Sequence, residues 1–379
     1  MRSAAVIDLA AIRANVGALA AATSAQVMAV VKADGYGHGM IPCAQAALDG
    51  GATWLGVAML EEALDLRTAG FAGPILAWLW TPDERENLER AVGEGIDVSV
   101  AAPWALDAVR AAVAATGRAG RIHLKIDTGL SRNGATAADW PALVAAAGAA
   151  EDAGEVEVVG IWSHFAYADE PGHPTIDRQI ERFRAAVDVA AGLGVRPQLR
   201  HIANSAATLT RPDAHFDLVR PGIAIYGLSP IPGDFGLVPA MSLRSHVALA
   251  KRIEAGEGVS YGHQYIAERP TTVALVPLGY ADGVPRAGTN CGPVTIGGGR
   301  FAVSGRVCMD QFAVDVGDAP ARAGDEVVLF GAGADGEPTA QDWADAVGTI
   351  HYEIVTRIGS RVPREYVDVP GAEQTMSTL

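Results

Sequence analysis

Residues 26–31, QVMAVV, are the first of eight short apolar runs that divide residues 26–220 of the chain. Longer alanine-rich amphipathic segments separate these runs, with clear helical patterns at residues 59–69, 83–92, 103–115 and 141–150. Apolar strands that alternate with helices are typical of a parallel sheet buried on both faces. Eight strand–helix units in roughly 200 residues favour a closed, TIM-type (β/α)8 barrel over an open sheet. The other seven predicted strands occupy residues 53–57, 75–78, 97–100, 121–126, 156–161, 198–203 and 217–220.

The pattern changes after Gly227. The segment 229–236, SPIPGDFG, is rich in proline and glycine and is predicted to connect two domains. We therefore expect a (β/α)8 barrel over residues 9–235 and a mainly β domain over residues 240–379. The short β-type runs of this second domain are predicted at residues 271–277, 294–296, 301–307, 312–316 and 326–330.

The composition is that of a large globular protein. Apolar residues make up 49% of the 379 positions and charged residues 19%, which excludes a disordered or fibrous chain. The 29 Lys and Arg residues against 44 Asp and Glu residues leave a net charge of −15 at pH 7. A field of this sign repels phosphate backbones and anionic lipids, so we expect neither nucleic acid nor a membrane surface as a partner.

The sequence contains no recognisable export or membrane signal. Asp8 and Arg13 interrupt the early apolar pattern, and the uncharged stretch 14–31 is interpreted as a helix end, a turn and a strand. The three cysteines are far apart and form neither a disulfide framework nor a zinc-binding CxxC pattern. We expect a soluble cytoplasmic protein without a metal site.

Polar residues collect at the carboxyl ends of the predicted strands, where barrel enzymes carry their active sites. A lysine such as Lys32, at the end of a strand, is ordinarily a solvent-exposed charge. Against the packed barrel interior, however, desolvation would lower its pKa and suit it to Schiff-base chemistry, and the spacing alone leaves both interpretations open. The polar residues at this rim are Lys32, Lys125, Arg132, His164, Asn204, Ser205 and Arg220.

The segment VVKADGYGHG at residues 30–39 resembles the pyridoxal-phosphate lysine motif of the alanine racemases. Nine further motifs follow the family order and extend the resemblance over nearly the whole chain. They are VIDLAAIRANV (6–16), HLKIDTGLSRNG (123–134), WSHFAYAD (162–169), HIANSAA (201–207), VRPGIAIYG (219–227), VSYGHQY (259–265), LGYADG (278–283), GRVCMDQ (305–311) and HYEIVTRIGSRVPREY (351–366). The family fold is a barrel followed by a β domain, and the resemblance implies that roughly residues 1–8 pair with the second domain.

The resemblance implies a homodimeric racemase that interconverts L-alanine and D-alanine with pyridoxal 5'-phosphate as cofactor. The pyridoxal ring is the electron sink that removal of an α-proton requires. Lys32 would bind the cofactor and act as the base on one face of the α-carbon, and Tyr261 from the partner subunit would act on the opposite face. A phenol with the reference pKa near 10 costs roughly 4 kcal/mol to ionise at pH 7. A positive neighbourhood must lower this cost, and the implied network runs from Tyr261 through His164 to Arg220.

The resemblance also implies the other contacts of the cofactor. Arg220 would donate to the pyridine nitrogen, and because a guanidinium keeps its proton, this contact would favour return of the proton over transamination. Arg132 would contact the phenolic oxygen of the cofactor and the substrate carboxylate, held in place by Lys125 as N6-carboxylysine. The phosphate would be bound by Tyr36, Ser205, Tyr352 and the backbone amides of Gly222 and Ile223, and Asn204 is a further cofactor residue by resemblance.

The substrate end of the site is implied to come partly from the second subunit. Met309 and Asp310 of that subunit would line it, and Tyr280 would narrow its entrance. We interpret His201 as a support for Arg220 and His38 as structural. The sequence departs from the common family pattern at Leu130-Ser131 and at Trp78.

Three alternatives to this function stay open. A racemase of the same family could prefer serine or a broader set of amino acids. A related decarboxylase is disfavoured by the VSYG and CMDQ motifs, and a non-catalytic pyridoxal-phosphate carrier is disfavoured by Tyr261, Met309 and Tyr352, which a carrier does not need. For the racemase, the implied role is D-alanine biosynthesis for peptidoglycan precursors.

Overall fold

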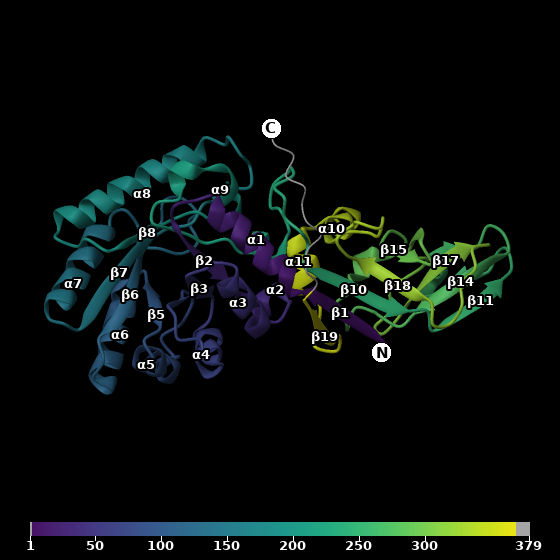
Figure 1. Cartoon of the computed structure of the whole chain (residues 1–379), viewed down its shortest axis with the longest axis horizontal. Coiled ribbons are helices and arrows are strands. Elements are labelled where there is room, and N and C mark those ends of the chain that lie inside the picture. The colour runs from purple at the N-terminus through teal and green to yellow at the C-terminus, as the bar shows by residue number, and fades with distance from the viewer. Residues whose placement is uncertain (1, 369–379) are drawn as a thin grey trace.

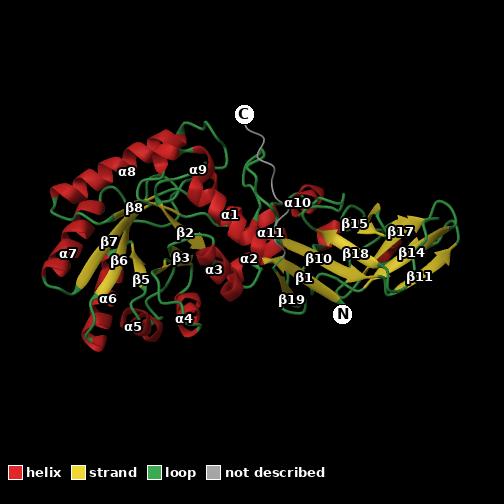
Figure 2. Cartoon of the chain, in the orientation of Figure 1, coloured by secondary structure: helices red, strands yellow, loops and turns green. Residues whose placement is uncertain are grey.

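A computed structural model of the chain describes residues 2–368. The molecule is elongated, with a parallel sheet ringed by helices at one end and a lobe of mainly antiparallel strands at the other (Figures 1 and 2). The predicted fold class, a (β/α)8 barrel followed by a mainly β domain, is therefore confirmed.

Eight parallel strands form the barrel in the order β8-β7-β6-β5-β4-β3-β2-β9. Backbone hydrogen bonds from Asp217 N to Arg200 O (3.1 Å) and from Arg220 N to Ala203 O (3.0 Å) join the two ends of this order. Each predicted apolar run overlaps one of these strands, with ends displaced by up to a few residues. Their bounds are β2 Gln26–Val30, β3 Trp54–Val57, β4 Ile75–Ala77, β5 Asp97–Val100, β6 Gly120–Lys125, β7 Val156–Trp162, β8 Leu199–His201 and β9 Leu218–Val219.

The helices of the barrel begin and end at residues suited to those positions. The Asp8 side chain accepts hydrogen bonds from Ala10 N and Ala11 N and so caps the first helix. Pro103 starts α6, and Gly117 ends it with a φ of +71°. The helices are α1 Leu9–Ala21, α2 Lys32–Tyr36, α3 Met40–Asp49, α4 Leu60–Thr68, α5 Arg85–Gly93, α6 Pro103–Thr116, α7 Trp140–Asp152, α8 Thr175–Gly192 and α9 Ser205–Thr210, with 3-10 turns η1 Pro212–Ala214 and η2 Ile223–Tyr226.

The second lobe contains a six-stranded sheet in the order β16-β15-β18-β10-β1-β19, a three-stranded sheet β11-β14-β17 and a two-stranded ribbon β12-β13. Helices α10 Ala340–Val347 and α11 His351–Thr356 follow the last hairpins, with 3-10 turns η3 Tyr261–His263 and η4 Arg286–Gly288 between the strands. The strands are β1 Ser3–Asp8, β10 Met241–His246, β11 Leu249–Ile253, β12 Gly258–Val259, β13 Tyr265–Ile266, β14 Thr271–Val276, β15 Pro293–Ile296, β16 Gly299–Ala302, β17 Phe312–Gly317, β18 Glu326–Phe330 and β19 Arg364–Val367.

One predicted strand, residues 301–307, is largely wrong, because β16 ends at Ala302. The reason lies at Gly305, which has a φ of +83°. A Cβ at Gly305 would lie 2.6 Å from the carbonyl oxygen of Val259. The chain therefore turns here against the segment that carries Tyr261 instead of continuing as a strand.

The amino-terminal strand belongs to the sheet of the second lobe. β1 pairs antiparallel with β10 and parallel with β19. On this basis we propose a division into a barrel domain of residues 9–235 and a β domain of residues 240–379 with roughly residues 1–8. Residues 1 and 369–379 of that proposal lie outside the described residues.

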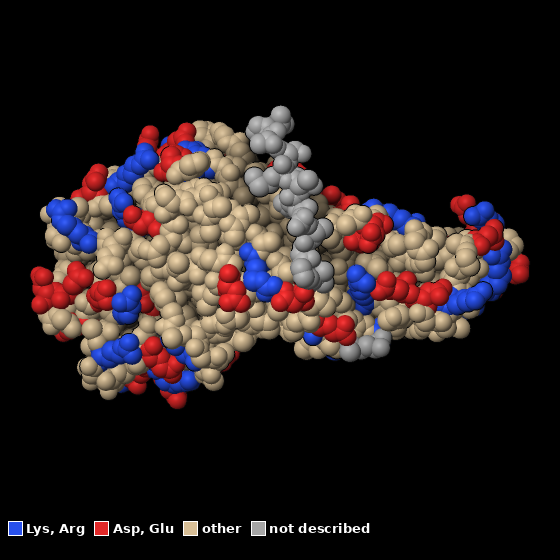
Figure 3. Space-filling model, viewed as in Figure 1, with Lys and Arg blue, Asp and Glu red and all other residues tan. Residues whose placement is uncertain are grey.

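The uncharged stretch 14–31 consists of the end of α1, a turn and β2, as the sequence predicts. No helix within residues 2–368 has the length and apolar character to cross a bilayer. On the face drawn in Figure 3, acidic and basic side chains are interspersed over both lobes.

Candidate active site

Lys32 lies where β2 leads into a left-handed turn. Ala33, Asp34, Gly35 and Tyr36 have φ values of 53°, 52°, 61° and 53°. Residues with a Cβ cost about 1–2 kcal/mol each in this region, so other contacts must stabilise the turn. Glu62 supplies one of them, since its carboxylate accepts a hydrogen bond of 2.6 Å from Ala33 N.

The side chain of Lys32 is enclosed by aromatic rings and cations. Its Nζ lies 5.9 Å from the ring centres of both Tyr36 and Trp78. Burial lowers the pKa of Lys32 below that of an ordinary lysine, Arg132 lowers it further, and the Glu62 carboxylate opposes both. The amine is therefore more easily deprotonated than a solvent-exposed one, as a nucleophile or base requires.

A compact group of polar atoms from the segments after β9 and at the start of α9 lies beside the turn. The Ser205 hydroxyl oxygen accepts hydrogen bonds from Gly222 N (2.8 Å) and Ala224 N (3.3 Å), so its own proton is available to a further acceptor. Gly222 lies against Tyr36, and a Cβ at Gly222 would lie 2.3 Å from Tyr36 Oη. Ile223 follows as the first residue of η2. Tyr352, from α11, lies on the same side, and its ring centre is 6.3 Å from that of Tyr36.

Arg220 is buried at the centre of the barrel mouth. Its guanidinium donates to His201 Nδ1 (3.0 Å), Ser163 O (2.8 Å) and His164 Nδ1 (3.2 Å). Burial lowers the pKa of Arg220 to about 9, which leaves the group protonated at neutral pH. Burial, and then Arg220 and Arg132, hold the pKa of His164 well below its ordinary value. His164 is therefore neutral, and because its Nδ1 accepts from Arg220, its Nε2 carries the proton.

Lys125 is almost fully buried beside the same cations. Its Nζ lies 4.0 Å from the ring centre of Trp162, and Trp162 also lies 4.9 Å beneath the Arg220 guanidinium. Burial, and then Arg220 and Arg132, lower the pKa of Lys125 to about 7. Within the described residues, Arg132 has no carboxylate at ion-pair distance. The cluster therefore gathers cations that outnumber the nearby carboxylates, Asp127 beside Lys125 and Glu62 beside Lys32.

Asn204 is at the edge of this group, and its side-chain oxygen accepts a hydrogen bond of 3.1 Å from Ala207 N. This contact caps α9, and the predicted cofactor role of Asn204 stays a prediction. The structure thus brings one set of predicted residues together at the barrel mouth: Lys32, Tyr36, Lys125, Arg132, His164, Asn204, Ser205, Arg220, Gly222, Ile223 and Tyr352.

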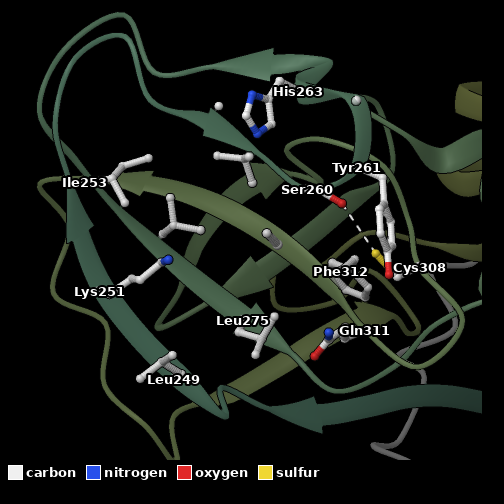
Figure 4. Close-up of a pocket in the computed structure, with 15 residues that line it drawn as sticks. Leu249, Lys251, Ile253, Ser260, Tyr261, His263, Leu275, Cys308, Gln311 and Phe312 are labelled. Atoms are coloured by element: carbon white, nitrogen blue, oxygen red, sulfur yellow. Dashed lines mark hydrogen bonds between the residues drawn. The ribbon is translucent and has the colours of Figure 1, made fainter.

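The other predicted site residues gather separately in the β domain. Tyr261 is 71% exposed and lines a pocket of about 530 Å³, at the end where Ser260 Oγ and Cys308 Sγ lie 3.4 Å apart (Figure 4). The side chains of Met309 and Tyr280 are also exposed, and Asp310 pairs with Arg361 at 2.8 Å. None of the residues that line this pocket belongs to the group at the barrel mouth.

Four residues in this region were not predicted from the sequence to belong to the site: Glu62, Asp97, His123 and Trp162. One signal was present, because Arg121, His123 and Lys125 alternate along β6 and alternate residues share a face of a strand. Their common face is the barrel interior, where several basic groups on one strand indicate polar partners or a functional role.

Two family models match the chain. The model of the alanine racemase N-terminal domain covers residues 7–230, and that of the C-terminal domain covers residues 240–366. The chain belongs to the alanine racemase family. The resemblance stated from the motifs is therefore confirmed, and the alanine racemases are isomerases.

Individual alanine racemases agree with this assignment. The chain is 61% identical to the alanine racemase of Frankia casuarinae over 373 residues, which are 97% of each chain. A solved alanine racemase from a D-cycloserine-producing Streptomyces lavendulae matches with a TM-score of 0.95 at 55% identity, over 97% of this chain and 98% of the other. The alanine racemase of Streptomyces coelicolor A3(2) matches over the same shares with a TM-score of 0.95 at 56% identity.

Proposed function

We propose that the protein interconverts L-alanine and D-alanine with pyridoxal 5'-phosphate as cofactor. The observation that carries the proposal is the position of Lys32, whose amine has a lowered pKa between aromatic rings at the barrel mouth. The curated relatives named alanine racemase support alanine as the substrate. The test is a coupled assay for D-alanine on purified protein, with hydroxylamine-treated, cofactor-stripped protein as control, and absence of D-alanine formation would contradict the proposal.

The residues at the barrel mouth fit the cofactor. The Ser205 hydroxyl has a proton to donate. Tyr36 Oη approaches Gly222 so closely that a side chain at residue 222 would occupy the space between them. We propose that Tyr36, Ser205, Tyr352 and the amides of Gly222 and Ile223 hold the phosphate. Asn204 is proposed to contact the cofactor beside them, and Arg220 is proposed to donate to its pyridine nitrogen.

The chain's own groups are proposed to move the protons. When bound, pyridoxal phosphate supplies an electron sink for the charge left at the α-carbon by proton removal. Lys32 holds the cofactor, then accepts and returns a proton on one face of that carbon. Arg132 holds the substrate carboxylate through its planar fork of donors.

A second proton carrier is proposed to come from a partner subunit. Tyr261 is exposed on a concave face of the β domain, away from the barrel mouth of its own chain, and this supports its use by a second copy. In the homodimer, the neutral His164 of one chain would donate its Nε2 proton toward the phenol of the other. Met309, Asp310 and Tyr280 would line the substrate end beside it. We further propose a cytoplasmic enzyme that supplies D-alanine for peptidoglycan precursors.

A racemase that prefers serine or accepts many amino acids is the main alternative. Initial rates across a panel of amino acids separate the two, and we expect alanine to give the highest kcat/KM.

The first prediction concerns Lys125, which we propose is carbamylated. The neutral amine attacks the carbon of CO2, a C–N bond forms, the proton passes to solvent and an anion results beside Arg132. Because the pKa of Lys125 is lowered to about 7, the reactive neutral form increases as pH rises through that value. With ¹³C-bicarbonate, NMR should show a carbamate signal that grows from below to above about pH 7.

Two variants assign that signal. Lys32→Ala should keep the carbamate signal and Lys125→Ala should lose it. An unmodified Lys125 in density or in a mass spectrum under bicarbonate would show the prediction to be wrong.

The second prediction concerns Gly222→Ala. The new Cβ would lie 2.3 Å from Tyr36 Oη, and Tyr36 has little room to move because it packs on Tyr226 and Tyr352. We expect the affinity for pyridoxal phosphate to fall by about tenfold or more, measured by fluorescence titration. Gly192→Ala is the matched control, since nothing lies within 4 Å of a Cβ there, and its affinity should be unchanged. Equal affinities in the two variants would contradict the proposed phosphate pocket.

A further inference from the structure

A continuous chain of buried hydrogen bonds leads from Arg220 to the opposite end of the barrel. Arg220 donates to His201 Nδ1 at 3.0 Å. His201 Nε2 lies 2.9 Å from His123 Nδ1, and His123 Nε2 lies 3.0 Å from Asp97 Oδ2. The side chains of Asp97 and His123 are fully buried, and so is His201.

The donor and the acceptor of each hydrogen bond follow from the two end groups, the guanidinium of Arg220 and the carboxylate of Asp97. A guanidinium only donates, so His201 Nδ1 must accept and His201 Nε2 must carry the proton. His123 Nδ1 then accepts from His201, and His123 Nε2 donates to the carboxylate of Asp97. Both histidines are thereby held neutral, each with its proton on Nε2.

These hydrogen bonds help to compensate for the burial of the Arg220 charge. A buried cation requires a compensating charge or full hydrogen bonding. Among residues 2–368, no carboxylate lies within ion-pair distance of Arg220, and its acceptors are neutral. Two imidazoles connect it to Asp97, whose own charge is balanced by Arg121 at 2.7 Å.

Aromatic packing also holds the hydrogen-bonded side chains of His201 and Arg220 in place. His201 stacks on Trp162 with ring centres 5.7 Å apart and planes 7° apart, and Arg220 lies 4.9 Å from the same ring. Hydrogen bonds in a medium of low polarity polarise one another along such a chain. Asp97 therefore acts on Arg220 through the orientation and polarisation of the two imidazoles, while its own charge is offset by Arg121.

We propose that Asp97 and His123 are positioning residues for catalysis, which act through His201 to orient and polarise the Arg220 guanidinium. The proposal rests on the proposed function, because its consequence for the reaction is the contact between Arg220 and the cofactor. A weaker or misdirected Arg220 would leave the pyridine nitrogen freer to gain a proton. More turnovers would then end in transamination instead of racemisation.

The first test measures the tautomers and is independent of activity. Full-length protein labelled with ¹⁵N-histidine is studied by NMR, with His123→Asn and His201→Asn used to assign the signals. We expect both histidines to be neutral with the proton on Nε2. A proton on Nδ1 of either residue, or an imidazolium at either, overturns the proposal while leaving the proposed racemase activity intact.

The second test uses Asp97→Asn, a change of nearly equal size that removes the charge. We expect kcat to fall by up to about 10²-fold with little change in KM, and the ratio of transamination to racemisation to rise. Val98→Ala, the next residue of β5 and also buried, is the matched control: it should lower Tm and leave that ratio unchanged. If Asp97→Asn lowers Tm and activity together but leaves the ratio as in the wild type, Asp97 is merely structural and the proposal fails.

Discussion

Replacing Lys32 by alanine is expected to lower racemisation in both directions by about 10⁴-fold or more. The variant loses the proposed covalent anchor of the cofactor and the proposed base at once. The variant keeps the groups proposed to bind the phosphate, so pyridoxal phosphate should still bind, although without a covalent bond. Coupled assays from L-alanine and from D-alanine measure the loss.

Two measurements distinguish loss of chemistry from loss of fold. Borohydride reduction followed by peptide mapping should place the cofactor on Lys32 in the wild type, and the chain has only two other lysines, Lys125 and Lys251, to compare. Addition of a small amine such as methylamine should restore part of the activity of Lys32→Ala. Covalent cofactor on Lys125 or Lys251, or full activity in the variant, would contradict the assignment of Lys32 as anchor and base.

Tyr261→Phe is expected to lower racemisation by about 10³-fold while the fold and the cofactor affinity stay unchanged. The substitution removes only a hydroxyl from a side chain that is exposed in one chain, so its cost in stability should be small. Lys32 would still remove and return a proton on one face of the α-carbon. In deuterated water, one enantiomer of alanine should therefore exchange its α-proton without inversion, as followed by NMR, and the other enantiomer should not exchange.

Complementation between variants tests whether Tyr261 acts across the dimer. In a mixture of Lys32→Ala and Tyr261→Phe chains, half of the dimers are hybrids, and each hybrid has one site with both residues intact. About a quarter of the wild-type activity should therefore return on mixing. If the mixture stays inactive although hybrid dimers form, the two residues serve the same chain and the proposed shared site is wrong.

The barrel could be predicted from the sequence because its strands are short, apolar and separated by helices. Local hydrophobicity alone marks such strands, and their order along the chain is also their order around the barrel from β2 to β8. The β domain was harder to predict, since β10 and the first strand pair with partners far away in the sequence. The failure at residues 301–307 has the same origin, because Gly305 turns the chain against the backbone at Val259.

The candidate site was predictable where one contiguous motif holds its residues together. Lys32 and Tyr36 lie in one such motif, and the ends of the other barrel strands bring the remaining barrel residues to the same mouth. The roles assigned to them stay predictions. Glu62 and Trp162 were missed because their contacts with the turn after Lys32, with Lys125 and with Arg220 depend on neighbouring strands and helices, not on spacing along the chain.

The sequence by itself determined the class of fold, the order of the barrel strands and the family, because each depends on patterns read within short windows of the chain. Only the tertiary structure decided that Tyr261 lines a separate pocket in the β domain, and that Asp97, His123 and His201 form one line of hydrogen bonds behind Arg220. The physical reason is register. The strands β5, β6 and β8 must be aligned to within a residue before an imidazole meets a carboxylate at 3.0 Å, and only the packed barrel sets that alignment.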